Sequence, residues 1–279
     1  MKRIIFTIAA MLFTATIFAQ TKTDTVVTTT TTITTVSTDT TKHSDTTRTK
    51  KRRFKFSFST DNHDTLKTPS KQPGFSYGFA FSRIDIGFAT LIDNGSFKLS
   101  ADNQFLRYRS WKSSNFGLDL VQIGYRFSSS FKIYASGGFD WTSYRLREDV
   151  SIKRFQPSLT YTTDDIDYEK NSFSSVYLRI PLTFYWRSHN DNHGHRFHLA
   201  GGPLMGFLMN GATRQKSTEN GEQKYTASFN LAKVQYGAFA RIGYGGIGMF
   251  AKYYFNDMFD DSPAQKGLKS FMIGATIGF

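Results

Sequence analysis

Residues 271–279, which read FMIGATIGF, alternate strictly between two kinds of side chain. One set is apolar and ends in an aromatic residue: Phe271, Ile273, Ala275, Ile277 and Phe279. The other set is mostly small or polar: Met272, Gly274, Thr276 and Gly278. Alternation with a period of two predicts a β-strand with one apolar face. A final aromatic residue on such a strand is typical of outer-membrane assembly signals, although a soluble edge strand could also end in this way.

The same alternation recurs along the preceding two hundred residues. It is regular in four further segments: 131–142, 176–187, 234–243 and 247–255. It is less regular in three others: 81–92, 115–127 and 197–210. Within 115–127, Leu118 and Leu120 are out of phase with Val121, which predicts a β-bulge near Leu120. Pro181 cannot donate a ladder hydrogen bond, so a second local bulge is expected there.

The connections between these segments are alternately short and long. Three are short: 128–130, 188–195 and 245–246. Four are long and polar: 93–112, 148–171, 211–228 and 258–267. Bacterial barrels have short periplasmic turns and longer extracellular loops. The sequence therefore predicts an all-β fold, an antiparallel up-and-down transmembrane β-barrel of about eight strands. An even strand number would place both termini in the periplasm.

The first 73 residues have a different composition. Lys2 and Arg3 precede an apolar run over residues 4–18, which predicts a signal peptide over residues 1–19. The run is shorter than the roughly 20 residues of a spanning helix, which disfavours a membrane anchor. Residues 20–73 are rich in Thr and then basic, which predicts a disordered periplasmic linker. The barrel is expected over residues 74–279.

Composition excludes several classes of protein. The 28 Phe and 14 Tyr coexist with a negative mean hydropathy of -0.38, as expected when lipid-facing and lumen-facing residues alternate. With no Cys, the chain has no disulfide, thiolate nucleophile or lipoprotein anchor. The formal net charge of +13 raises nucleic-acid binding, but an exported protein rarely meets nucleic acid. Outer-membrane lipid and the barrel assembly machinery are the expected partners.

Charged residues recur on the face of the strands that is opposite the apolar one. They are Lys132, Asp140, Arg179, Arg187, Arg241 and Lys252. These side chains could line a pore, but side chains just fill the interior of an eight-stranded barrel. A packed polar core is therefore predicted. Asp140 and Arg179 are expected to form an ion pair across neighbouring strands.

Two clusters suggest metal chemistry. The first is a histidine group: His189, His193, His195 and His198. Imidazoles suit zinc, copper and nickel, but the Asn, Asp and Gly residues around them favour a solvated turn. The second is an acidic group: Asp164, Asp165, Asp167 and Glu169. Its spacing matches no calcium loop, which favours a solvated loop. No catalytic, metal or cofactor-binding residue is assigned, and no cofactor is expected.

Four motifs resemble one known family. They are YLRIPL at 177–182, GGFDW at 137–141 with Tyr144, the pair YGA and RIGY within 236–244, and the terminal strand at 273–279. Together they are similar to the Bacteroidetes outer-membrane β-barrel family, the PorT-like group. The resemblance implies an eight-stranded barrel linked to secretion or envelope maintenance, with no catalytic residues to transfer.

The expected function is that of a non-enzymatic outer-membrane barrel with a structural, adhesion or secretion-accessory role. Other envelope or secretion proteins are a further class of expected partner. The alternative is a small barrel enzyme acting on lipid or peptide. No His lies in a predicted extracellular loop, which argues against a His-based site at the outer rim.

Overall fold

The computed structural model describes residues 73–191 and 194–278. All of them fall in the second of the two units into which the chain divides, residues 54–279. The predicted signal peptide, nearly all of the predicted linker, His193 and the terminal Phe279 lie outside the described residues. The expectations that concern them stay predictions.

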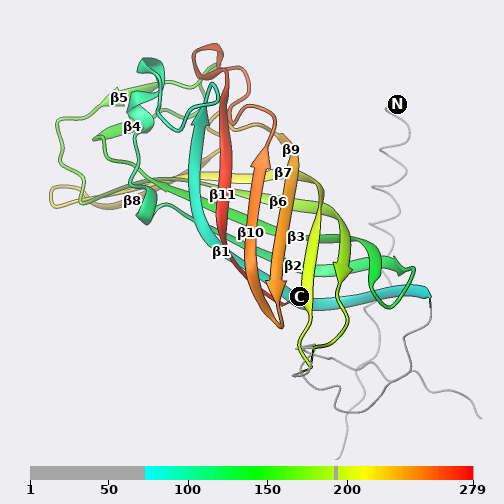
Figure 1. Cartoon of the computed structure of the whole chain (residues 1–279). Helices are drawn as coiled ribbons and strands as arrows, with labels where there is room; N and C mark the ends of the chain where they lie inside the picture. Colours follow the sequence, from blue (N-terminus) through cyan, green and yellow to red (C-terminus); the bar gives the residue numbers. More distant parts are fainter. Residues whose placement is uncertain (1–72, 192–193, 279) are drawn as a thin grey trace, which may run out of the picture. The chain divides into compact units, whose positions relative to one another are not determined.

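Eight long strands form a closed barrel (Figure 1). They are β1 (Gly74–Asp93), β2 (Ser114–Arg126), β3 (Phe131–Arg145), β6 (Lys170–Arg187), β7 (Phe197–Ser217), β9 (Val234–Tyr244), β10 (Ile247–Tyr254) and β11 (Leu268–Ile277). Every neighbouring pair is antiparallel, and the ring closes where β1 pairs with β11. The predicted all-β, antiparallel barrel of about eight strands is confirmed.

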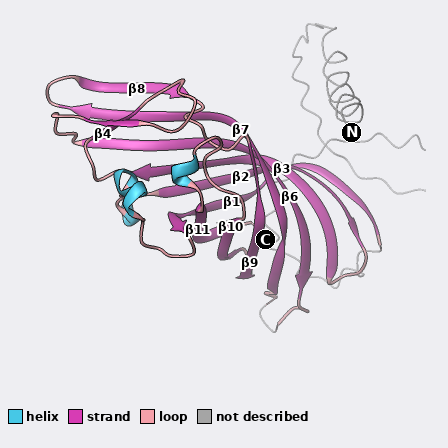
Figure 2. Ribbon diagram, turned by 90° about the horizontal axis from the view of Figure 1, so that it is seen from above, coloured by secondary structure: helices cyan, strands magenta, loops and turns pink. Residues whose placement is uncertain are grey.

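Shorter elements occupy the long connections. β4 (Val150–Ile152) and β5 (Tyr161–Thr163) form a separate hairpin, and β8 (Gly221–Ala227) pairs with the end of β7. The described residues also form three 3₁₀ turns: η2 (Ala101–Leu106), η3 (Ser110–Lys112) and η4 (Pro263–Gln265). Figure 2 shows β7 and β8 running side by side away from the barrel. The predicted long loops therefore contain more regular structure than their polarity suggested.

The outer face of the barrel strands is apolar. Along β6 the outward residues include Ile180, Leu182, Phe184 and Trp186, each of which is exposed. The inward residues between them are buried, so burial alternates with the same period as hydrophobicity. A contiguous apolar surface of this extent is typical of a membrane-facing protein. Among the described residues, no helix has the length and apolar character needed to cross a membrane.

The predicted bulge near Leu120 is confirmed. Asp119 lies opposite Gly138 on β3, whereas Val121 lies opposite Gly137. Two steps along β2 thus correspond to one step along β3, and Leu120 is the extra residue. The bulge restores the alternation that the sequence had broken at this point.

The predicted bulge at Pro181 is wrong. The β3–β6 register is the same on both sides of the proline, with Ala135 opposite Leu182 and Gly138 opposite Arg179. The β6–β7 ladder shifts register only nearer to the long-loop end. A missing N–H donor removes ladder hydrogen bonds, but it does not require an extra residue. The strand therefore passes through Pro181 with a gap in its β3 pairing.

The interior has two parts of opposite character. A charged group lies in the barrel lumen, where Phe239 and Phe250 pack against Arg241 and Lys252. The main apolar cluster begins at such lumen residues and continues into the end that carries the long connections. We call the connections 94–113, 146–169, 218–233 and 255–267 the loop cap. Its apolar core includes Leu106, Leu146, Leu231 and Phe259, which come from four separate connections.

Candidate functional site

Seven charged side chains meet inside the barrel, and we call them the lumen charge cluster. They are Arg83, Asp85, Asp119, Asp140, Arg179, Arg241 and Lys252, each no more than 4% exposed. They come from six strands: β1, β2, β3, β6, β9 and β10. Strand alternation turns them all inward because the opposite face of each strand is the apolar one.

Asp85 is the hub of this cluster. Its Oδ2 atom lies 2.9 Å from Nη1 of Arg179, 2.8 Å from Nη2 of Arg241 and 3.2 Å from Nζ of Lys252. One carboxylate oxygen thus lies against three cations on three other strands, and it accepts hydrogen bonds from Arg179 and Arg241. Among the described residues, Nε and Nη1 of Arg241 have no hydrogen-bond partner in the protein.

Asp119 holds a second group of cations. Its Oδ1 atom accepts hydrogen bonds from Nε and Nη2 of Arg179, at 3.0 and 2.7 Å. Its Oδ2 atom accepts from Nη1 of Arg83 at 3.4 Å. Hydrogen bonds between ionised partners are stronger than those between neutral ones. Arg179 therefore joins β1 and β2 through Asp85 and Asp119.

Asp140 forms the third anionic position. Nζ of Lys252 lies 3.1 Å from Oδ1 of Asp140, and the Asn115 side-chain amide donates to the same oxygen at 3.0 Å. The Tyr254 hydroxyl lies 3.2 Å from Oδ2. Nη1 of Arg179 is farther, at 3.8 Å from Oδ1. The predicted pair of Asp140 with Arg179 is present, but it is the longest of these contacts.

The lumen is therefore a packed polar core, as predicted, at four positions: Asp140, Arg179, Arg241 and Lys252. The other two predicted residues, Lys132 and Arg187, lie near the short-turn rim. Sequence reasoning missed Arg83, Asp85 and Asp119. Arg83 and Asp85 are two residues apart in the expected strand 81–92, so alternation alone could have placed both on one face.

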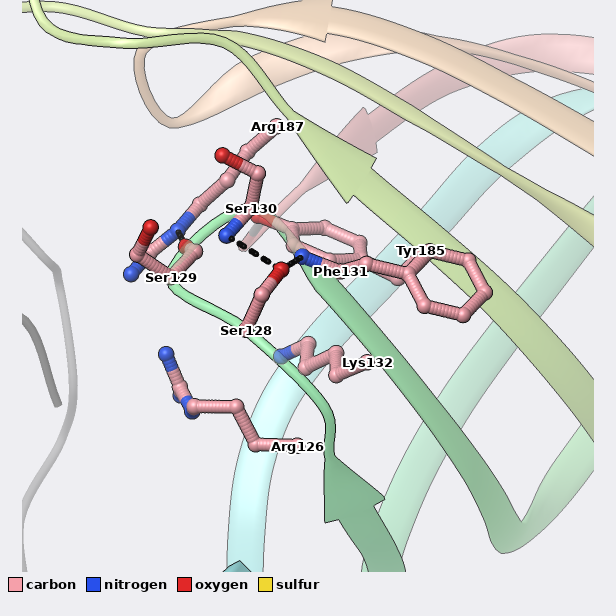
Figure 3. A pocket seen from close by; sticks show the side chains of 8 residues that line it. All are labelled: Arg126, Ser128, Ser129, Ser130, Phe131, Lys132, Tyr185 and Arg187. Atoms are coloured by element: carbon pink, nitrogen blue, oxygen red, sulfur yellow. Dashed lines mark hydrogen bonds between the residues drawn. The ribbon is translucent and has the colours of Figure 1, made fainter. Parts of the chain in front are cut away.

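The short-turn rim carries a shallow basic pocket (Figure 3). Its lining is Arg126, Ser128, Ser129, Ser130, Phe131, Lys132, Tyr185 and Arg187. Nε of Arg187 donates to the Ser129 carbonyl at 2.7 Å, and Nζ of Lys132 lies 4.3 Å from the centre of the Tyr185 ring. Three cations and no carboxylate line this pocket, so the pocket is positively charged.

The three described members of the histidine group, His189, His195 and His198, are not gathered into one site. His198 faces the lumen from β7, where it is buried and hydrogen-bonded to the Tyr185 hydroxyl. His195 lies in the turn against the Tyr244 ring, and His189 is exposed. Among the described residues, no three His, Cys, Asp or Glu side chains lie close enough together to hold a metal ion. The described histidines thus belong to a turn and to the lumen.

The acidic group in the loop cap is also dispersed. Asp164 accepts a hydrogen bond from the Tyr168 hydroxyl at 3.0 Å, and burial together with this carboxylate raises the pKa of Tyr168. Glu169 pairs with Lys216 at 2.7 Å, and this ammonium lowers the pKa of Glu169. The two remaining carboxylates are exposed: Asp165 and Asp167. The structure therefore gathers no calcium site from them.

A closed antiparallel barrel with an apolar outer belt and a charged lumen defines a transmembrane β-barrel of the outer-membrane type. The chain belongs to the family described as outer membrane protein beta-barrel domain, whose family model matches residues 71–260. No curated protein matches the chain.

Two solved structures are similar to this chain. The crystal structure of Ail, the attachment invasion locus protein of Yersinia pestis, is 13% identical, with 75% of this chain and 99% of that chain covered and a TM-score of 0.29. Ail in complex with the heparin analogue sucrose octasulfate is 12% identical with the same coverage and a TM-score of 0.30. The fold assignment rests on the family match and on the geometry above.

Proposed function

We propose that this protein is a non-enzymatic outer-membrane barrel that presents its loop cap at the cell surface as an adhesive platform. The main observation in support of this proposal is that four long connections pack onto one shared apolar core. Within this proposal the chain is a member of the PorT-like group of Bacteroidetes barrels. Outer-membrane lipid and the assembly machinery are its general partners.

Contacts between separate connections support a preformed platform. The Leu159 amide donates to Oγ of Ser262 at 3.0 Å, and Nδ2 of Asn230 donates to the Pro157 carbonyl at 3.2 Å. These bonds join the connections that follow β3, β7 and β10. A surface that is already ordered loses less conformational entropy on binding. The ordered connections of the loop cap therefore favour tight binding of a partner.

Three large aromatic side chains of the loop cap are exposed to solvent. Phe155 is 84% exposed, Trp111 70% and Phe97 67%. Aromatic residues contribute a large share of binding energy at protein interfaces. Phe155 also has a φ of 58°, which bulky residues rarely adopt. Strain of this kind is concentrated at functional positions, so Phe155 and Trp111 are the first residues to test.

The adhesion role is tested by the retention of whole cells on polystyrene and on a lawn of the same strain. Cells displaying Trp111→Ser with Phe155→Ser should lose most of the retention that the wild-type protein confers. Cells displaying Lys233→Ser with Lys266→Ser, two exposed non-aromatic positions of the same cap, should keep it. If wild-type cells adhere no better than cells without the barrel, the adhesion role is wrong.

The filled lumen supports a role other than diffusion. Purified protein in planar bilayers should show no steady conductance while the lumen charge cluster is intact. The alternative function, an enzyme acting on lipid or peptide, predicts turnover of purified lipid A or of peptides in detergent. Turnover of either substrate would replace the adhesion proposal.

The orientation is part of the proposal. Gly74 lies opposite Arg126, next to the first short turn, and Ile277 lies opposite Ile247, next to the last one. Both ends of the barrel therefore meet the short-turn rim, which we place in the periplasm. Single cysteines at Thr163 and Asn220 should react with a membrane-impermeant reagent on intact cells, and cysteines at Ser129 and Asn190 should not. The reverse pattern would invert the orientation.

A further inference from the structure

The outward face of neighbouring strands changes from apolar to cationic at a shared height. On β3 and β6, Trp141 lies opposite Val176, and a pair of serines follows. The next pair is Arg145 opposite Ser172. Arg145 is four residues beyond Trp141, or about 13 Å along the strand. This distance suits the headgroup layer that borders the hydrocarbon core.

A segment of the loop cap extends this cationic surface beside β3. The Arg109 amide donates to the Arg145 carbonyl at 2.7 Å, and the Arg147 amide donates to the Arg107 carbonyl at 2.8 Å. The residue between the two arginines of each segment packs towards the apolar core. All four arginines therefore project from the opposite, outer face. Arg107 and Arg109 lie on one segment, beside Arg145 and Arg147 on the other.

The surface continues across β6, β7 and β8. Ser172 lies opposite Arg214, and Arg214 lies opposite Lys224. One step further from the barrel, Lys170 lies opposite Lys216. Residues directly opposite in an antiparallel pair share one face of the sheet. The cations of these strands therefore extend the row that begins with Arg109 and Arg145.

We call this surface the basic band. Its members are Arg107, Arg109, Arg145, Arg147, Lys170, Arg214, Lys216 and Lys224. Three carboxylates pair with it: Glu148 with Arg107, Glu169 with Lys216 and Glu222 with Arg214. Eight cations thus face three anions. Like charges directly opposite each other destabilise a sheet, so the band is stabilised when an anionic partner covers it.

We propose that the basic band binds the phosphate groups of lipid headgroups in the leaflet that surrounds the long-loop end. On the orientation in the proposed function, these belong to phosphorylated glycolipids of the outer leaflet. Guanidinium groups bind phosphate oxygens in a bidentate manner, and lysines attract them as point charges. The band is continuous with the lipid-facing belt through Trp141 and Val176, which brings it to the headgroups rather than to a distant ligand.

The test uses the full chain refolded in nanodiscs of phosphatidylcholine, with or without diphosphorylated lipid A, and measures the thermal midpoint. Lipid A should raise the midpoint of the wild-type protein. The variant Arg107→Gln, Arg109→Gln, Arg147→Gln should lose more than half of that increase. The control Lys153→Gln, Lys233→Gln, Lys266→Gln removes equal charge from exposed cap positions outside the band and should keep the increase.

Further arms separate the outcomes. The charge-retaining variant Arg107→Lys, Arg109→Lys, Arg147→Lys should keep most of the increase, even if the glutamine variant folds poorly. An unchanged wild-type midpoint, or an equal increase in the glutamine variant, would overturn the proposal. A rise with heparin but not with lipid A would assign the band to soluble polyanions. Both leaflets of a nanodisc have the same lipids, so the result is independent of orientation, which cysteine labelling tests separately.

Discussion

The charged part of the barrel lumen and the core of the loop cap differ in polarity, and the chain passes from the barrel into the cap at the end of β3. Within the barrel β3 points Asp140 inward and Trp141 outward. Just past its end, Leu146 is buried in the cap core and Arg147 is exposed. The surroundings of the outer face change from lipid to water along this one segment. The comparison teaches that alternation with a period of two defines the strand. The medium outside, lipid or water, decides whether the polar or the apolar residues are turned inward.

The two regions also differ in what holds them together. Ion pairs and charge-assisted hydrogen bonds link the lumen strands, whereas burial of apolar side chains links the connections of the cap. Removing one buried charge leaves its partners uncompensated, and removing one apolar side chain leaves a cavity. Substitutions in the two regions should therefore differ in how much they lower the free energy of unfolding and in how much of the molecule they affect.

The largest effect is expected for Asp85→Ala. The change leaves Arg179, Arg241 and Lys252 without their shared acceptor, and an uncompensated buried charge costs about 3–5 kcal/mol. Urea unfolding of the refolded barrel in micelles measures the loss. Asp102→Ala, an exposed carboxylate of the loop cap, should change stability by less than about 0.5 kcal/mol. Equal losses for the two variants would mean that the cluster does not hold the barrel.

Leu231→Ala should come next, with a loss of about 2–3 kcal/mol, the lower part of the range for Leu to Ala in a core. Leu231 is 1% exposed and lies in the cap core. The loss should be local, so amide hydrogen exchange should quicken in the cap connections and stay slow in β2 and β3. Faster exchange throughout the barrel would show that cap and lumen unfold as one unit.

A smaller effect is expected for the coupling energies that distinguish the two cationic partners of Asp140, Lys252 and Arg179. A double-mutant cycle of Asp140→Asn with Lys252→Met should give a coupling of about 1–2 kcal/mol, within the usual range for contacting groups. The cycle with Arg179→Met should give less because Arg179 is held mainly by Asp85 and Asp119. The ion pair predicted from the sequence, Asp140 with Arg179, is therefore expected to be the weaker of the two. A coupling with Arg179 larger than that with Lys252 would contradict the observed pairing.

The smallest effect is a pH dependence at the cap surface. Lys216 lowers the pKa of Glu169, so this pair stabilises the fold above the usual glutamate pKa of about 4.3. The contribution is lost as pH falls through the lowered pKa of Glu169. Wild type and Glu169→Gln should differ slightly in thermal midpoint at pH 7 and converge in acid. A difference that grows in acid would exclude this role.

Much of the barrel was predictable because lipid enforces a simple pattern. Strict alternation located the strands, and the phase break at Leu120 located a bulge that the structure contains. The inward positions of Asp140 and Arg179 followed from the same count. Their closest partners did not, because these depend on the register of the closed ring. The second predicted bulge is absent because the missing donor at Pro181 leaves the β3–β6 register unchanged.

The loop cap was harder to predict for a different reason. Its core residues Leu106, Leu146 and Leu231 are isolated in polar stretches that are far apart in the sequence. No local period identifies them, so they read as solvated loops. The strand extensions of β6 and β7 were missed because their outward residues become polar above the membrane, where the expected alternation ends.

Asp85 lies beside the seam where the barrel closes, since it is opposite Thr276 on β11. Its cationic partners belong to β6, β9 and β10, so they reach it only when the last strand meets the first. A slip of one residue at this seam would turn Asp85 from the lumen to the lipid face. The cluster therefore favours the closed ring, because a misaligned or half-closed ring leaves these ions apart and only the correct register brings each carboxylate against its cations.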